Sequence, residues 1–371
     1  MKTYAYLLTM SMAVSAAMTS CSQDDVVTAD PGRPIEFHID MTSRTTHYTT
    51  DNLDQISVFA YDGDDLEFEE IFTRDSNTST FKSATPHYWE KDLYFIVIGG
   101  NSYENGGSNF EKIDNINEVD WNASYGVLSP GQYGIVKNKD LDSPLLVYTL
   151  PENATEQYDL IVATASGSAS DQDSGVALQF EHILSKITFK AFENHDAANI
   201  KLGQTELKNI QTSGIYEIET KKWTRLANPK SQVCNPLNGD MQNLTSEANE
   251  YLMDHFLIIP QDATAWDADN DHENTGNGTY LSYKLDVTVG GKQMIPYETS
   301  DGQTRDAGYT PIGRTWEAGK QYVYTLDFTD GFGNTSPEDP EPAKPLLSPV
   351  QFTCSVVDWN RSAEPTINAG E

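Results

Sequence analysis

Short runs of β-branched and aromatic residues recur along nearly the whole chain, and this recurrence most constrains the fold. Asn, Asp, Gly, Ser and Pro separate the runs, as turn residues separate strands. In residues 35–40 apolar and polar residues alternate, which is typical of a half-buried strand. No strand–helix alternation appears, so a parallel α/β sheet is disfavoured and an all-β sandwich architecture is predicted. Strands are expected at 35–40, 55–61, 93–98, 145–150, 158–164, 176–192, 205–219, 251–259, 279–289, 321–328 and 350–357.

Helical periodicity is scarce. Phe110, Ile113, Ile116 and Val119 recur every third residue and predict one short surface helix. A polar segment at 194–199 interrupts two long β segments, and a Pro-rich stretch at 329–349 favours an extended linker. The predicted organisation is one β domain at 34–194, a second at 195–330, and a linker with a final strand at 331–371.

The first twenty residues predict a secretory signal. Lys2 precedes an apolar stretch of about 15 residues, shorter than the ~20 that span a bilayer. The sequence Met18-Thr19-Ser20-Cys21 resembles a lipobox, which predicts lipidation of Cys21; the alternative is an ordinary signal peptide with a chance cysteine. Residues 21–33 would form an acidic tether whose start resembles the surface-export signal of Bacteroidetes lipoproteins. Acyl chains would anchor the protein in the outer membrane at the cell surface.

The charge balance excludes one class of partner. With 24 basic and 56 acidic residues, the formal net charge is −32. Nucleic-acid binding requires clustered Lys and Arg, so nucleic acid is not expected as a partner.

No catalytic, cofactor or metal motif stands out. A nucleophile elbow, a zinc-binding His-Glu-x-x-His and a Gly-rich phosphate loop are all missing from the sequence. The acidic loop from Asp267 has His272 and Gly278 where a calcium loop needs Gly and Glu, so a solvated loop is favoured. We therefore predict no enzyme activity, no cofactor and no metal. Cys234 and Cys354 are either free thiols, which is slightly favoured, or an oxidised pair in an exported chain.

The two ends of the chain suggest a mechanical role. Arg44 lies in a polar loop after the strand that carries Ile35, Phe37 and Ile39, and an Arg-specific protease could cut there. Removing that strand from a sandwich would leave a groove with unpaired backbone groups. The final strand has four apolar residues on one face that could fill such a groove on another molecule, contributing about 6–10 kcal/mol: Val350, Phe352, Cys354 and Val356. The alternative is that both strands complete their own domain.

Several segments resemble the fimbrillins of Bacteroidetes. Residues 178–189, with Phe180, His182 and Lys186, are similar to an F-x-H-x-L-S-K-I segment of that family. Residues 316–326 resemble its W-x-x-G-x-x-Y-x-Y-x-L segment. Residues 35–45, 158–161 and 356–359 are also similar, and the segments occur in the family order.

This resemblance implies two transthyretin-like Greek-key β-sandwich domains and export as a lipoprotein. It further implies a structural pilin assembled by Arg-directed proteolysis and donor-strand exchange, supporting cell adhesion. The expected partners are other fimbrial subunits, an Arg-specific protease and the outer membrane. The alternative hypotheses are a surface glycan-binding or adhesive lipoprotein that does not polymerise, and a hydrolase.

Overall fold

The structure is a computed structural model that describes most of the chain as β-strands. The described residues are 32–39, 53–78, 80–100, 128, 130–136, 143–151, 154–233, 241–250, 256–267, 278–295, 308–334, 348 and 350–359. Within these ranges, helical turns occur only as short 3₁₀ segments at Ala154–Glu156 and Ala169–Asp171. The all-β sandwich prediction is therefore confirmed. The expected helix around residues 110–119 lies outside the described residues.

The first sheet has eight strands and curls over itself. Its order is β10 (Glu181–His182), β8 (Ile161–Gly167), β5 (Leu93–Gly99), β2 (Gln55–Asp62), β3 (Asp65–Arg74), β4 (Thr80–Ser83), β1 (Phe37–Ile39) and β9 (Val176–Leu178). Side chains from β1, β4 and β9 share one apolar cluster with those from β2, β5 and β8. The two ends of the sheet thus face each other across a common core.

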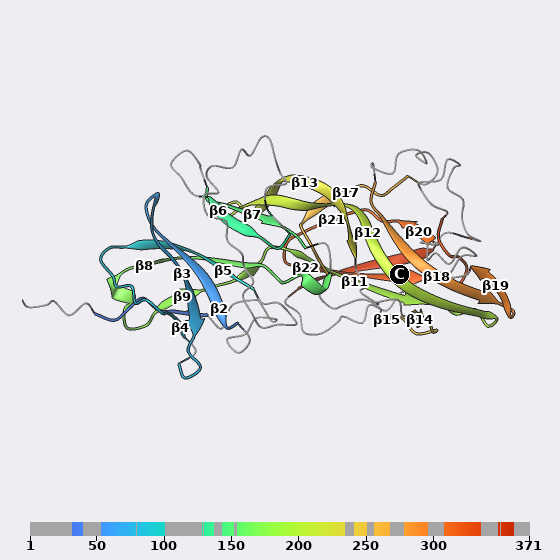
Figure 1. The fold of residues 1–371 in the computed structure, drawn as a ribbon, viewed down its shortest axis with the longest axis horizontal. Helices are drawn as coiled ribbons and strands as arrows, with labels where there is room; N and C mark the ends of the chain where they lie inside the picture. Colours follow the sequence, from blue (N-terminus) through green and yellow to red (C-terminus); the bar gives the residue numbers. More distant parts are fainter. Residues whose placement is uncertain are drawn as a thin grey trace, which may run out of the picture.

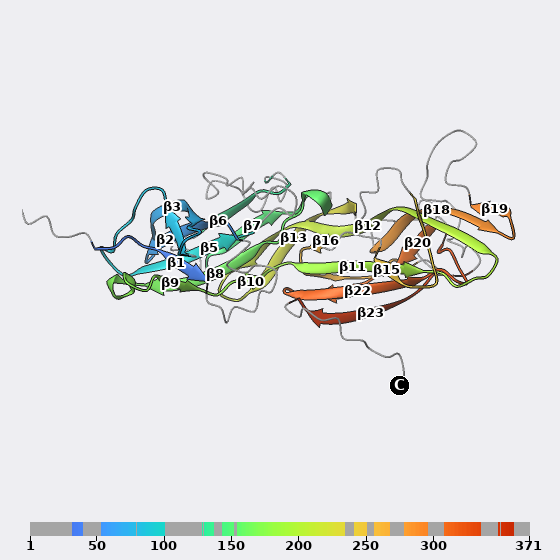
Figure 2. The same cartoon turned by 90° about the horizontal axis from the view of Figure 1, so that it is seen from below.

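The second sheet is built around one long strand. Strand β12 (Ala198–Glu217) pairs through its first half with β18 (Tyr280–Val289) and through its second half with β7 (Leu145–Thr149). The other members are β6 (Tyr133–Val136), β13 (Lys222–Val233), β14 (Gln242–Asn243), β19 (Lys292–Ile295) and β20 (Gly308–Pro311). Figures 1 and 2 show β12 extending from the far end of the elongated molecule, beside β19, to its middle, beside β7.

The third sheet closes the second half of the molecule. Its order is β15 (Asn249–Glu250), β11 (Ser185–Phe192), β22 (Lys320–Asp327) and β23 (Gln351–Asp358), with β16 (Phe256–Ile258) also on β11. Strands β17 (Gln261–Ala263) and β21 (Arg314–Trp316) form a separate pair. The chain passes from the first to the third sheet between β10 and β11. The predicted boundary at 194/195 falls in the next loop and, like the Greek-key connectivity, stays a prediction.

Three main apolar clusters hold these layers together. One lies inside the curled first sheet, and one lies between β11, β22 and the first half of β12 with β18. The third joins β2, β5 and β8 to β6, β7 and the end of β12, and it also contains Trp359. Within the described part of the chain, no helix has the length and apolar character needed to cross a membrane.

Candidate strand-exchange site

Strand β1 occupies an interior position of the first sheet. Phe37 lies opposite Phe81 of β4 in an antiparallel pair and opposite Val176 of β9 in a parallel pair. The backbone N–H of Ile35 donates to the carbonyl of His87 at 2.7 Å. Taking β1 away would therefore leave unpaired backbone groups on both flanking strands.

The three apolar residues of the first strand are all buried. Ile35 and Ile39 are buried, and Phe37 is 0% exposed. The Phe37 ring packs edge-on against Phe72 at 5.1 Å and against Phe95 at 5.0 Å, measured between ring centroids. Such T-shaped contacts are favourable aromatic geometry, so removal of β1 would open an aromatic-lined slot in the core.

The final strand lies at an edge of the third sheet. It pairs antiparallel with β22 from Lys320↔Asp358 to Asp327↔Gln351, and among the described strands β22 is its partner. Cross-strand pairing places Phe352, Cys354 and Val356 on the face that also carries three buried residues of β22: Leu326, Tyr324 and Tyr322. The strand thus presents its apolar face toward its own core from an edge position.

This edge position leaves the final strand incompletely covered. Phe352 is 40% exposed and Val356 is 38% exposed, whereas Val350 just before the strand is buried. Cys354 is partly buried, and burial raises the pKa of its thiol. The first strand and the final strand therefore have opposite burial, although their apolar patterns are alike. Cys21, Arg44 and Cys234 lie outside the described residues.

Four of the segments that resemble fimbrillins meet at one buried junction: residues 158–161, 178–189, 316–326 and 356–359. Asp159 Oδ2 lies 2.5 Å from Nδ1 of His182, and both side chains are buried. Trp359 stacks on the His182 ring with 4.1 Å between centroids and 12° between planes. The backbone N–H of Trp359 donates to the carbonyl of Gly319 at 3.0 Å. Sequence reasoning placed His182 in a strand but missed its pairing with Asp159, because the two residues lie in different segments.

The turn before β22 is shaped by one glycine and several aromatic residues. Gly319 adopts a φ of +68°, a conformation that side chains other than glycine rarely take. The Nε1–H of Trp316 donates to the hydroxyl of Tyr324 at 2.9 Å, and the hydroxyl of Tyr322 accepts from the backbone N–H of Glu317. These aromatic residues therefore pack and orient the turn.

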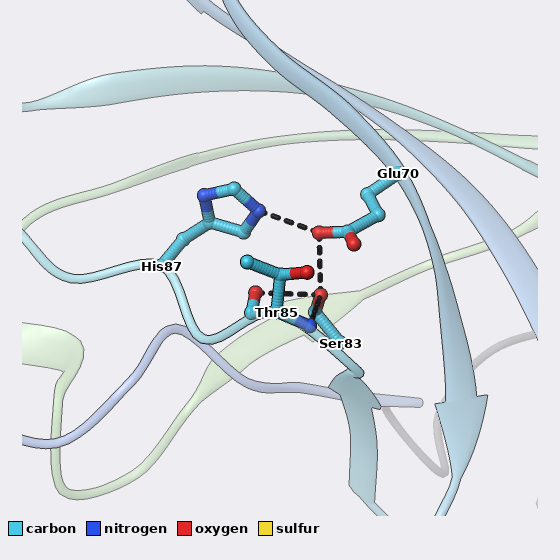
Figure 3. A network of polar contacts seen from close by, with 4 residues as sticks. All are labelled: Glu70, Ser83, Thr85 and His87. Carbon is cyan, nitrogen blue, oxygen red and sulfur yellow. Dashed lines mark hydrogen bonds and ion pairs between the residues drawn. The ribbon is translucent and has the colours of Figure 1, made fainter.

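A polar cluster lies on the first sheet at β3 and β4 (Figure 3). Glu70 Oε2 lies 2.6 Å from His87 Nε2 and 2.5 Å from Ser83 Oγ, which in turn accepts from the N–H of Thr85 at 3.0 Å. Burial raises the pKa of the Glu70 carboxyl, but the hydrogen bonds from Ser83 and His87 outweigh it, and the net pKa is lowered. The Glu70 carboxylate lies between the Ser83 hydroxyl and the His87 imidazole and holds the two side chains in one network.

A cavity of about 290 Å³ lies beside this cluster. Aromatic, acidic and basic residues line it, including Phe68, His87, Tyr88, Glu90 and Lys91. The Phe68 and His87 rings stack at 3.8 Å, and Tyr88 is 38% exposed. Across the described residues, no group of three or more His, Cys, Asp or Glu gathers in a way that could hold a metal ion.

Several solved structures have a similar fold. A fimbrial protein from Bacteroides vulgatus matches with a TM-score of 0.54 at 11% identity, over 88% of this chain and 99% of that one. A proposed cell adhesion protein from Bacteroides uniformis gives 0.48 at 14% identity, over 89% and 100%. Another from Bacteroides eggerthii gives 0.46 at 17% identity, over 89% and 97%. No curated protein sequence matches significantly.

The likeness to the Bacteroides vulgatus structure defines a β-sandwich fold of the fimbrial kind. The sequence profile described as Fimbrillin-like matches residues 43–359. The chain therefore belongs to the fimbrillin-like family.

Proposed function

We propose that this chain is a structural pilin that assembles by donor-strand exchange into an adhesive appendage on the cell surface. The precursor is exported as a lipoprotein through Cys21 and reaches the outer membrane. An Arg-specific protease cuts after Arg44, which frees the segment that contains β1. Strand β23 of a neighbouring subunit then fills the vacated groove. Membership of the fimbrillin-like family supports the fimbrial and adhesive part of this proposal.

The contrast in burial between β1 and β23 carries the proposal. Phe37 is fully buried between two aromatic rings, whereas Phe352 is 40% exposed in its own subunit. Moving β23 into the groove of a neighbour would bury the apolar area that its own edge position leaves in water. Each fully buried side chain of this kind contributes about 1.5–3 kcal/mol. Backbone hydrogen bonds to β4 and β9 would set the register, as in strand addition generally.

The placement of the two strands favours a filament. Strand β1 lies in one half of the elongated molecule and β23 in the other (Figure 2). A groove in one half and a donor strand in the other make a contact between different surfaces of the two subunits. Such heterologous contacts produce open chains when the rotation between subunits does not close a ring.

A structural role without catalysis fits the chemistry of the site. The strand-exchange site consists of apolar side chains and backbone groups, which need no cofactor. Its partners are other fimbrial subunits and, during maturation, the Arg-specific protease.

Polymerisation of the purified precursor tests the proposal. Digestion with an Arg-specific protease should convert monomer into a ladder of oligomers on a native gel. The matched control is Arg44→Gln, which removes the cut and should leave the chain monomeric. A chain that is trimmed after Arg44 and remains monomeric would refute self-assembly of this subunit.

The cavity beside His87 supports a second candidate, a surface glycan-binding lipoprotein that does not polymerise. Its size suits a single sugar ring, and the exposed Tyr88 could stack on that ring while Glu90 and Lys91 bind hydroxyl groups. A glycan array should then show binding that is lost in Tyr88→Ala. An array without binding would remove this candidate and leave the pilin proposal standing.

A further inference from the structure

The final strand is held at its two ends and covered poorly between them. Val350 precedes the strand and is buried in the apolar cluster between β11, β22, β12 and β18. Trp359 follows the strand and is 2% exposed. Between them, Phe352 and Val356 remain more than a third exposed. Because apolar burial is concentrated at the ends, the ends and the backbone pairing with β22 retain the strand in its own subunit.

The seat of Trp359 lies at the junction between the first and third sheets. The indole is part of the cluster that also contains Leu160, Ile183 and Leu257. The indole stacks on the face of the His182 ring, and Nδ1 of that ring contacts the Asp159 carboxylate. The residue immediately after β23 is thus inserted among residues that precede β8, follow β10 and lie in β16.

Two contacts fix the approach of the chain to this seat. The Trp359 backbone N–H donates to Gly319. The Lys320 ammonium lies 2.5 Å from the Asp358 carboxylate, an exposed ion pair of the kind that contributes little by itself. The polar contacts therefore orient the end of the strand, and the buried indole supplies most of its retention.

The seat is nevertheless imperfect. The Nε1–H of Trp359 is buried, and no described residue offers it a hydrogen-bond acceptor. By contrast, the Nε1–H of Trp316 donates to Tyr324. In the released strand this N–H would donate to water, and in the seat it loses that hydrogen bond. The loss costs free energy, so the indole is held less firmly than its burial alone implies. An anchor of this kind is suited to being withdrawn.

We propose that Trp359 is a latch that keeps β23 in its own subunit and sets the rate at which the strand is released to a neighbour. The strand cannot separate from β22 along its whole length until the indole leaves its seat on His182. The latch delays donation until a neighbouring groove is open to receive the strand. This inference rests on the proposed strand exchange and assigns its control to a junction distant from the groove.

Hydrogen exchange of the intact precursor tests the latch without polymerisation. Trp359→Leu fills much of the apolar seat but cannot stack on His182, and the β23 amides should exchange at least about tenfold faster than in the parent chain. Trp89→Leu is the matched control, because Trp89 packs against Phe95 of β5 in the first sheet, away from β23. That variant should leave β23 exchange unchanged. Equal β23 exchange in Trp359→Leu and the parent would overturn the latch.

A second variant keeps the test decisive if Trp359→Leu does not fold. Trp359→Phe retains a stacking ring in the seat, and its β23 exchange should lie between those of the parent and the fully released strand. Protection equal to that of the parent, in a variant that has lost the five-membered ring of the indole, would also count against the latch.

Polymerisation after protease treatment separates this inference from the proposed function. Faster β23 exchange together with faster ladder formation supports both. If the β23 amides exchange hydrogen faster but the chain never polymerises, Trp359 does retain the strand, and donation of β23 to a neighbour is refuted. Ladders that form at the parent rate despite faster exchange refute control by the latch and leave the pilin proposal intact.

Discussion

The Asp159 carboxylate contacts the His182 imidazole at 2.5 Å where neither side chain is more than 1% exposed. The two residues belong to segments that are separate in sequence and meet only because β10 pairs with β8. A polar pair buried this deeply fixes the geometry on which Trp359 rests.

Substituting one member of this pair should be costly. Asp159→Leu leaves His182 without its carboxylate partner, and we expect a loss of about 3–5 kcal/mol in unfolding free energy. Urea denaturation measures this loss. In the double variant Asp159→Leu with His182→Leu, the loss should be smaller than the sum of the two single losses. Additive losses would show that the two side chains do not interact.

The exchange proposal predicts opposite effects at two phenylalanines. Phe37→Ala empties a fully buried aromatic site and should destabilise the precursor by about 3–5 kcal/mol. Phe352→Asp alters a side chain that is 40% exposed and should change precursor stability by only about 1 kcal/mol or less. After protease treatment, however, Phe352→Asp should form no ladder on a native gel. Normal ladders from that variant would contradict burial of Phe352 in a groove.

The groove should also accept the strand as a free peptide. A synthetic peptide of residues 348–359, added in excess during protease treatment, should cap the grooves and leave monomer in place of oligomers. The same peptide with Phe352→Asp is the control and should not inhibit. Inhibition by both peptides alike would indicate an effect unrelated to the apolar face of the strand.

The thiol of Cys354 can report release of β23. Burial raises the pKa of this thiol, so little thiolate forms near neutral pH while β23 is paired with β22. In a chain that begins after Cys21 and carries Cys234→Ser, Cys354 is the remaining thiol. Its alkylation should be at least about tenfold slower in the folded precursor than in urea. Equal rates would show that β23 is already open.

The polar cluster at Glu70 predicts a specific dependence on pH. Its carboxyl pKa is lowered in the folded state, so its stabilising contribution is present above the ordinary Glu pKa and is lost as pH falls through the folded value. At pH 7, Glu70→Gln should lower the unfolding free energy by about 0.5–1.5 kcal/mol. The difference between variant and parent should shrink in acid. A difference independent of pH would assign the loss to packing.

The strands most readily predicted from sequence are those with period-two or fully apolar patterns. The runs around residues 55–61, 93–98 and 321–328 correspond closely to β2, β5 and β22. Strand β3 was missed, because Glu67, Glu69 and Glu70 give Asp65–Arg74 the appearance of an acidic loop. Their side chains are tolerated there because the strand has a partly exposed face.

The buried junction was beyond sequence reasoning for a different reason. Local patterns identified the segments that contain Asp159, His182 and Trp359, but pairing across segments depends on sheet topology. A single sequence carries no signal for that pairing. The burial contrast between Phe37 and Phe352 was likewise invisible, since both lie in strands with similar apolar alternation.

Strand β12 has a mechanical consequence for any filament built from this subunit. Its 20 residues pass from one apolar cluster to another as one continuous strand, paired with β18 over the first half and with β7 over the second. A pull along the molecule would therefore load its inter-strand hydrogen bonds in shear, many at once, instead of stretching a slack connector. A cell held by such an appendage in flowing liquid would be tethered by a chain of stiff rods.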